Sequence, residues 1–186
     1  MNGMLNPNQA SKSLPISRTA LEVFVLSVIG IAAILLRTKL RIPLNLPGHH
    51  GVEVMALLLI GRHWSKLPMA TSVSTIAAAL FMFVPWVGVK DPFLPLIYLL
   101  IGLTVDTLYR LKTSENKLVI SMMIIGSLSY AVIPLTRLVL HFLFNYPYVV
   151  FLKTGYAYPV LSHFVFGAAG GLLAALLIKG QRKILK

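Results

Sequence analysis

The sequence lacks cysteine and has few acidic residues. Its 186 residues include five Asp and Glu, and charged residues of both signs make up only 12% of the chain. The absence of cysteine excludes disulfides, thiolate metal sites and a cysteine nucleophile. Because ordinary soluble domains carry about 25% charged residues, the scarcity of charge excludes a soluble globule.

What the chain has instead is apolar side chains, which make up 57% of it. A soluble domain of this length has too much surface for its volume to bury them. The composition therefore predicts an all-α, polytopic membrane protein. The 17 Lys and Arg residues lie between apolar runs, a pattern typical of topology signals and of contact with anionic lipids of the bilayer. We expect no nucleic-acid partner, since that would require one basic face.

Six apolar runs predict a bundle of about six transmembrane helices. The runs cover residues 20–36, 52–61, 69–89, 93–109, 118–144 and 158–178. The second run is too short to cross about 30 Å of hydrocarbon by itself. We expect a flexible tail over residues 1–17, a six-helix transmembrane domain over 18–179 and a basic cytoplasmic tail over 180–186.

The distribution of basic residues predicts the orientation. Most of them fall in the tails and in alternate loops, which places both termini of a multi-pass protein in the cytoplasm, at the cytoplasmic membrane. Arg37, Lys39 and Arg41 break this rule, because they share one outer loop, RTKLRIPLNLPGHHG, residues 37–51. We therefore expect the functional site at this loop.

The sequence holds no motif of a catalytic site. It has no G-x-S-x-G, no H-E-x-x-H and no paired acidic motif. We expect a protein that is not an enzyme, with no catalytic residues and no cofactor.

Two acidic residues have ordinary structural interpretations. Asp106 lies four residues before Arg110, which predicts an i,i+4 pair on one helix. Asp91 precedes a proline and is typical of a turn. Glu53 leaves two interpretations open, an acid at a helix N-terminus or a member of a polar cluster that binds a ligand.

The histidines also leave two interpretations open. His49 and His50 are adjacent, and His141 and His163 lie near the same predicted outer side. The four could converge on a metal ion, or they could be hydrogen-bond partners in a polar pocket. We favour the second interpretation and expect no resident metal.

Arg137 lies inside an apolar run, three residues after Pro134. Such an arginine either extends its guanidinium to the membrane interface or faces a pocket, where it would hold a carboxylate or phosphate. The outer loop 145–157 that follows is rich in aromatic residues, among them Tyr146, Tyr148 and Tyr156. These form an interfacial belt or a lid over a flat ligand, and Trp86 could join either.

Small residues recur at helical spacing in the first and last runs. Their small side chains allow another helix to approach closely, either inside the bundle or from a second membrane protein. The residues are Ser27, Gly30, Ala33, Gly167, Gly171 and Ala175.

This layout resembles the substrate-binding S components of energy-coupling factor (ECF) transporters. The stretch RIPLNLPGHHGVEVMALLLIGRHWSKLPMA, residues 41–70, is similar to the loop and helix of the biotin-type members. HFVFGAAGGLLAALLIKGQRKI, residues 163–184, is similar to the last helix and basic tail of the family. Metal-binding members have a histidine directly after the initiating Met, where this chain has Asn2.

The resemblance implies uptake of a vitamin-like micronutrient. An S component binds its ligand under the first outer loop, docks on a membrane coupling subunit driven by ATPase subunits, and topples to release the ligand inside. The surplus of cations favours an anionic ligand, and the aromatic loop suits a flat ring. The alternative is a protein outside transport, either an assembly factor or a subunit of an enzyme that handles lipid phosphates. The expected substrate-binding residues are Arg37, Arg41, His49, His50, Glu53, Trp86, Arg137, His141, Tyr146, Tyr148, Tyr156 and His163.

Overall fold

The computed structural model describes residues 14–39, 46–111 and 117–184, and its regular elements there are all helices. The helices are α1 (Leu14–Lys39), α2 (Gly51–Trp64), α3 (Ala70–Phe81), the short 3-10 helix η2 (Pro85–Val87), α4 (Leu94–Arg110), α5 (Leu118–Phe144), α6 (Val149–Thr154) and α7 (Ala157–Ile184). The predicted all-α helix bundle is therefore confirmed.

Three of these helices are long and apolar enough to cross a membrane. The qualifying segments lie in α1, α5 and α7 and cover Arg18–Lys39, Leu118–Phe144 and Ala157–Arg182. At 1.5 Å per residue, about 20 residues span the hydrocarbon core. The other helices of the described chain are shorter, so the structure supports a membrane protein without establishing six complete spans.

Three predicted segments differ in the structure. The run 69–89 is not one helix, because α3 ends at Phe81 and η2 begins at Pro85, whose ring nitrogen has no hydrogen to donate. The loop 145–157 contains the short helix α6. The last helix continues to Ile184, into the segment predicted as a basic tail.

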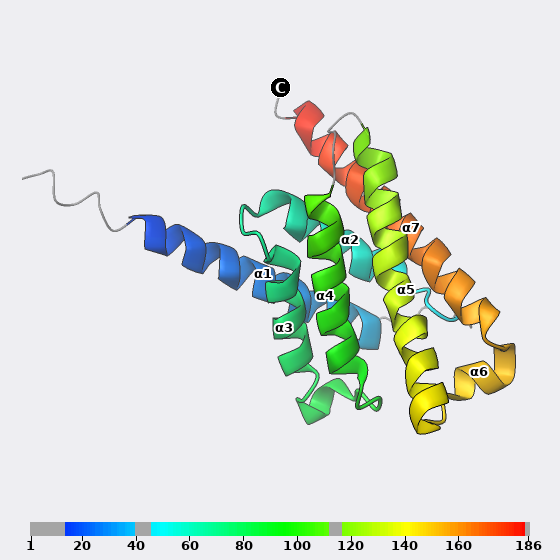
Figure 1. Cartoon of the computed structure of the whole chain (residues 1–186). Coiled ribbons are helices and arrows are strands. Elements are labelled where there is room, and N and C mark those ends of the chain that lie inside the picture. The colour runs from blue at the N-terminus through cyan, green and yellow to red at the C-terminus, as the bar shows by residue number, and fades with distance from the viewer. Residues whose placement is uncertain (1–13, 40–45, 112–116, 185–186) are drawn as a thin grey trace, which may run out of the picture.

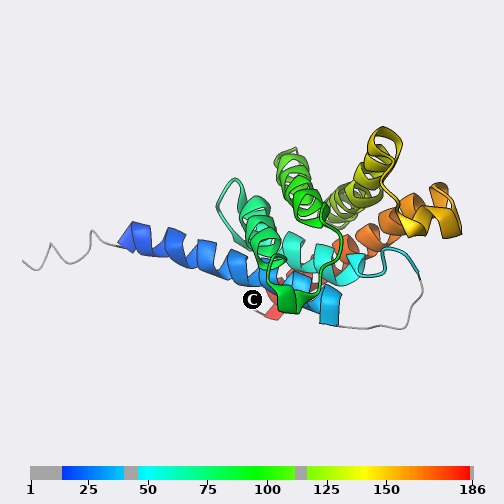
Figure 2. The same ribbon diagram turned by 90° about the horizontal axis from the view of Figure 1, so that it is seen from below.

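The helices form two packed groups that are joined through α2 and through a direct contact between α4 and α5 (Figure 1). α5 runs alongside α7, α3 packs between α1 and α4, and α2 contacts both groups. Figure 2 shows that the N-terminal half of α1 extends beyond the bundle, with exposed apolar side chains such as Leu21 and Phe24. Such a surface suits contact with lipid.

Small residues let the helix backbones touch inside the chain. A Cβ atom on Gly30 of α1 would collide with the carbonyl of Ser74 in α3, and one on Gly171 of α7 would collide with the carbonyl of Met122 in α5. Gly167 meets the carbonyl of Gly126 in the same way.

The predicted docking surface is therefore used differently in this structure. Gly30, Gly167 and Gly171 make these backbone contacts. Ala33 and Ala175 are fully buried in the core. Ser27 donates its hydroxyl to the carbonyl of Val23 in its own helix. The buried small residues therefore make contacts between helices of this chain, which is the first of the two predicted alternatives.

Asp106 joins three helices at one end of the bundle. It does not pair with Arg110 as the spacing predicted; its Oδ1 lies 3.0 Å from Nε of Arg62 on α2. The backbone N–H groups of Thr71 and Ser72 donate to its two oxygens, at 3.1 and 2.8 Å. The carboxylate therefore satisfies the first amides of α3, which a helix start leaves without partners. Arg110 instead donates to the carbonyl of Pro68.

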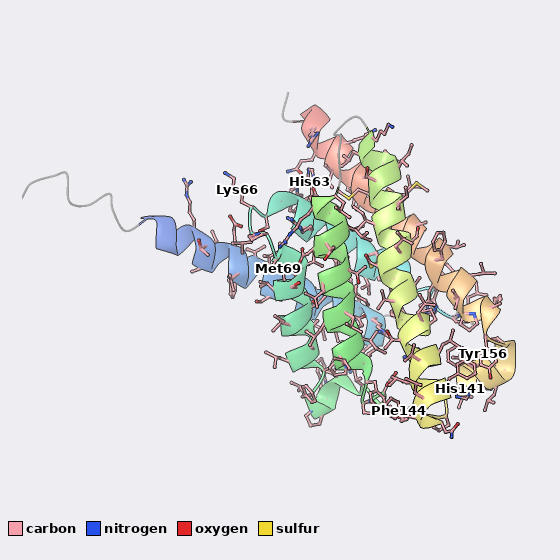
Figure 3. The ribbon with its side chains drawn as sticks, viewed as in Figure 1. His63, Lys66, Met69, His141, Phe144 and Tyr156 are labelled. Atoms are coloured by element: carbon pink, nitrogen blue, oxygen red, sulfur yellow. The ribbon has the colours of Figure 1, made fainter. Side chains whose placement is uncertain are left out.

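The two ends of the bundle carry different polar groups (Figure 3). The end near Asp106 includes His63 and Lys66, and the opposite end includes His141 and Tyr156. His63 contacts the hydroxyl of Tyr109 through Nδ1 at 2.8 Å, which ties α2 to α4. The groups predicted to bind a ligand lie toward the other end.

Candidate functional site

A cavity of about 220 Å³ lies where the end of α1, the turn before α2, α5 and α7 meet. The walls include apolar side chains such as Pro134, Phe151 and Pro159. The polar groups in the walls are Arg37, His49, His50, Tyr130, Arg137 and His163. The described lining contains two guanidinium groups and no carboxylate, so its charge is positive.

Arg37 is held by a buried tyrosine. Its Nη1 donates to the hydroxyl of Tyr98 at 3.1 Å, and its guanidinium carbon lies 5.5 Å from the centre of the same ring. Tyr98 is fully buried in α4. The hydrogen bond and the cation–π contact orient the cation without neutralising it.

Arg137 faces the cavity with a counter-ion beside it. Its Nη2 lies 2.7 Å from Oδ2 of Asp91, and both side chains are 17% exposed. The other carboxylate oxygen of Asp91 accepts the backbone N–H of Phe93 at 3.0 Å. The predicted turn residue is therefore also the anchor of the arginine. Of the two predicted roles of Arg137, the structure places it in the wall of a pocket.

The turn before α2 brings two histidines to the cavity. Gly48 has φ +82°, a left-handed conformation that suits glycine, and a Cβ there would lie 2.8 Å from the ring of His163. The rings of His49 and His50 are 3.9 Å apart between their centroids. His50 also bonds through Nδ1 to Glu53, which places that acid at the edge of the site.

Three of the four predicted histidines share the cavity, and His141 does not. His163 stacks on Tyr130 with 5.1 Å between ring centroids. His141 bonds through Nδ1 to the carbonyl of Tyr146, and its ring packs beside that of Tyr156 (Figure 3). Within the described ranges, no three His, Asp or Glu side chains come close enough to hold a metal ion. The four histidines therefore do not converge on one point among the described residues.

The predicted aromatic residues divide between two places. Tyr146 and Tyr148 line a second cavity of about 310 Å³, which shares Arg137 with the first and includes Lys90 and Asp91. Trp86 is 66% exposed, and Nζ of Lys39 lies 4.1 Å from the centre of its ring. Trp86, His141 and Tyr156 do not line either cavity. Arg41 lies outside the described residues.

Tyr148 remains a hydrogen-bond donor at physiological pH. Burial raises the pKa of its hydroxyl to about 12, and the negative charge of Asp91 acts in the same direction. The guanidinium carbon of Arg137 lies 5.2 Å from the centre of its ring. A neutral phenol next to an arginine suits recognition of an anion.

Sequence reasoning missed Tyr130, Tyr98 and the pairing of Asp91. Tyr130 lies seven residues before Arg137 on α5, and two turns of helix return to the same face. That spacing was a usable signal for Tyr130. Tyr98 reaches its arginine from another helix and Asp91 from the loop before α4, and a single sequence contains no signal for such contacts.

We expect stability to fall when the medium is acidified. Burial lowers the pKa of His50 below the ordinary histidine value of 6.5, although the hydrogen bond to Glu53 opposes the shift. The unfolded chain therefore binds a proton at His50 before the folded chain does. The stabilising contribution is present above pH 6.5 and is lost as the pH falls through the lower folded value.

The measurement is the melting temperature in detergent between pH 8 and pH 5. Wild type should lose stability on acidification, and His50→Gln should show a shallower loss because the titrating ring is gone. Parallel curves for the two proteins would contradict this role of His50.

Comparisons with protein-family models, with curated proteins and with solved structures found no match for this chain. The function must therefore be inferred from the site.

Proposed function

We propose that this protein is a membrane-embedded substrate-binding subunit for the uptake of a small organic anion. The observation that carries the proposal is the cavity lined by Arg37, Arg137 and three histidines, with no carboxylate in its described lining. Polar groups that converge on a concave, mostly apolar-walled site are typical of ligand binding.

The charges favour an anion over a cation. Asp91 neutralises Arg137 in part, whereas Arg37 has an uncharged tyrosine as its hydrogen-bond partner. A carboxylate in the cavity would gain charge-assisted hydrogen bonds from guanidinium groups that are already oriented. The low dielectric of the surroundings strengthens such bonds relative to water.

The ring faces in the wall support a ligand with a flat part. Tyr130 and His163 line the cavity and are already stacked on each other. An aromatic wall of this kind stabilises a planar ligand by face or edge contacts. A carboxylate-bearing vitamin or a similar micronutrient has both features.

The proposal includes the cellular setting predicted from the sequence. The protein would be multi-pass in the cytoplasmic membrane with both termini in the cytoplasm, as the basic residues indicate. It would work with a membrane coupling subunit and ATPase subunits, as the resemblance to ECF S components implies. It would bind and release its ligand without chemical change.

The test is native mass spectrometry of the detergent-purified protein, followed by binding measurements on two matched variants. We expect wild type to carry a small organic acid. Arg37→Met should weaken its binding about 30-fold or more, equivalent to about 2 kcal/mol, because it removes a partly buried charge partner. Lys39→Met is the control, since it removes the same charge two residues away from an exposed position over Trp86.

The melting temperature of each unliganded variant shows whether it is folded. A folded Arg37→Met protein that binds like wild type would contradict the proposal. So would a wild-type protein that carries no ligand and is not stabilised by any acid in a panel of vitamins and tetrapyrroles. That result would favour an assembly factor or a subunit of a lipid-phosphate enzyme.

A further inference from the structure

The hydrogen-bond pattern of two histidines in the cavity restricts the ligand further. We infer that the ligand is an organic acid that also carries N–H or O–H donors, such as a hydroxy acid or an amide-bearing acid. This inference rests on the proposed function, because it assumes that the cavity binds a small molecule.

The first step is the position of the proton on each ring. Nδ1 of His49 lies 2.7 Å from the carbonyl oxygen of Leu46, and Nδ1 of His163 lies 2.7 Å from the carbonyl oxygen of Pro159. A carbonyl oxygen accepts hydrogen bonds and never donates them. Both Nδ1 atoms must therefore carry the hydrogen.

The second step concerns the other ring nitrogen, Nε2, of each histidine. A neutral imidazole has one donor nitrogen and one acceptor nitrogen. With the hydrogen on Nδ1, the Nε2 atoms of His49 and His163 are acceptors. The backbone carbonyls thus fix two acceptors in a wall whose charged groups are the guanidinium donors of Arg37 and Arg137.

The third step is that one of these acceptors has no partner. Nε2 of His49 is buried and has no hydrogen-bond partner among the described residues. A buried acceptor without a partner costs free energy, because it has lost its hydrogen bond to water. A ligand that supplies a donor removes this cost, and a ligand that has only acceptors does not.

The two groups of wall residues therefore select for two features of one molecule. The guanidinium groups of Arg37 and Arg137 suit the acid group, and the imidazoles suit hydroxyl or amide hydrogens. Sulfate and a plain fatty acid satisfy the arginines only. A metal ion would also use Nε2 atoms, but stable sites need three or four ligands, and no such group converges in the described parts of the chain.

The experiment compares acids that share a carbon number and differ in hydroxyl groups. Gluconate and hexanoate are the first pair, followed by further hydroxy or amide acids with their deoxygenated analogues, and by sulfate and zinc as separate probes. Binding is measured by calorimetry on the whole protein in detergent. We expect the donor-bearing member of a pair to bind at least about tenfold more tightly.

Two variants of His49 test the cause of the preference. His49→Phe removes the acceptor, and we expect it to reduce the preference to about threefold or less. His49→Gln keeps a side-chain carbonyl acceptor and should retain part of the preference. The melting temperature without ligand shows that each variant is folded, and Lys39→Met again serves as the control at an exposed site.

Each outcome separates this inference from the proposed function. Equal binding of both members of the pairs, with loss in Arg37→Met, would overturn the inference and leave the anion site standing. Binding of sulfate as tight as that of any organic acid would do the same. Stabilisation by zinc that His49→Phe abolishes would overturn the inference in favour of a metal. If no acid of any kind binds, the proposed function fails together with the inference.

Discussion

Asp106→Asn is expected to lower the free energy of unfolding by about 3–5 kcal/mol, because it leaves the buried guanidinium of Arg62 without a counter-ion. Asp106 is 1% exposed, and Arg62 is 8% exposed. The carboxylate also accepts from the hydroxyl of Ser72 at 2.7 Å and from two amides of α3. An asparagine has the same shape, yet it has one acceptor oxygen and no charge.

The measurement is unfolding of the purified protein in detergent, followed by helical circular dichroism. Thr107→Ala is the control, since Thr107 is an exposed neighbour on α4 that donates only to the carbonyl of Leu103. It should change stability by less than about 0.5 kcal/mol. Wild-type stability in Asp106→Asn would show that the Arg62–Asp106 pair does not hold the helices together.

A double-mutant cycle separates the pair from the rest of the network. Arg62→Gln combined with Asp106→Asn should be less destabilising than the sum of the two single changes, because neither charge is then left alone. Strict additivity would mean that Asp106 acts only through the amides of α3. The cycle therefore assigns the stabilisation to the ion pair or to the helix cap.

Gly171→Ala is expected to destabilise the protein by about 1–3 kcal/mol or more, because a single added methyl group forces two helix backbones apart. The new Cβ would collide with the carbonyl of Met122 and would lie 2.9 Å from Cα of Met123. These are backbone atoms, so no side-chain rotation relieves the contact. The expected signs are a lower melting temperature and weaker contact between α5 and α7.

The same helix contains a matched control. Gly180 lies nine residues further along α7, and a Cβ there meets nothing within 4 Å. Gly180→Ala should be neutral or stabilising by up to about 1 kcal/mol, since alanine favours helix over glycine. If both variants had the same stability, that result would contradict the close approach of α5 and α7 at Gly171.

Several elements followed from local sequence alone. The predicted run 118–144 coincides with α5, because Lys117 precedes it and Asn145 ends it with φ 51°, a left-handed conformation that asparagine tolerates. Pro134 does not end the helix, as is common in apolar helices that pack against neighbours. The third run, residues 69–89, was predicted as one helix, but the helix ends before Pro85. The proline was the local signal for this interruption.

The cavity was predictable only in part. Arg37, His49 and His50 were identified because they share one predicted outer loop with other cations, and Arg137 and His163 because ionisable or polar rings within apolar runs are costly to bury without a purpose. His141 and Trp86 met the same criteria and lie elsewhere. Residue type and approximate depth select candidates, but they carry no information about which helix faces meet.

What the sequence by itself determined was the helical, membrane-compatible character of the chain and the positive charge near one loop. Both follow from composition and from spacing along one helix, which are properties of neighbouring residues. Only the tertiary structure decided that Asp106 pairs with Arg62, that Arg137 pairs with Asp91 and that Arg37 rests on Tyr98. Each of these pairs joins different elements, and the geometry that brings them together comes from the packing of whole helices, including the glycine contacts that set how closely α5 and α7 approach.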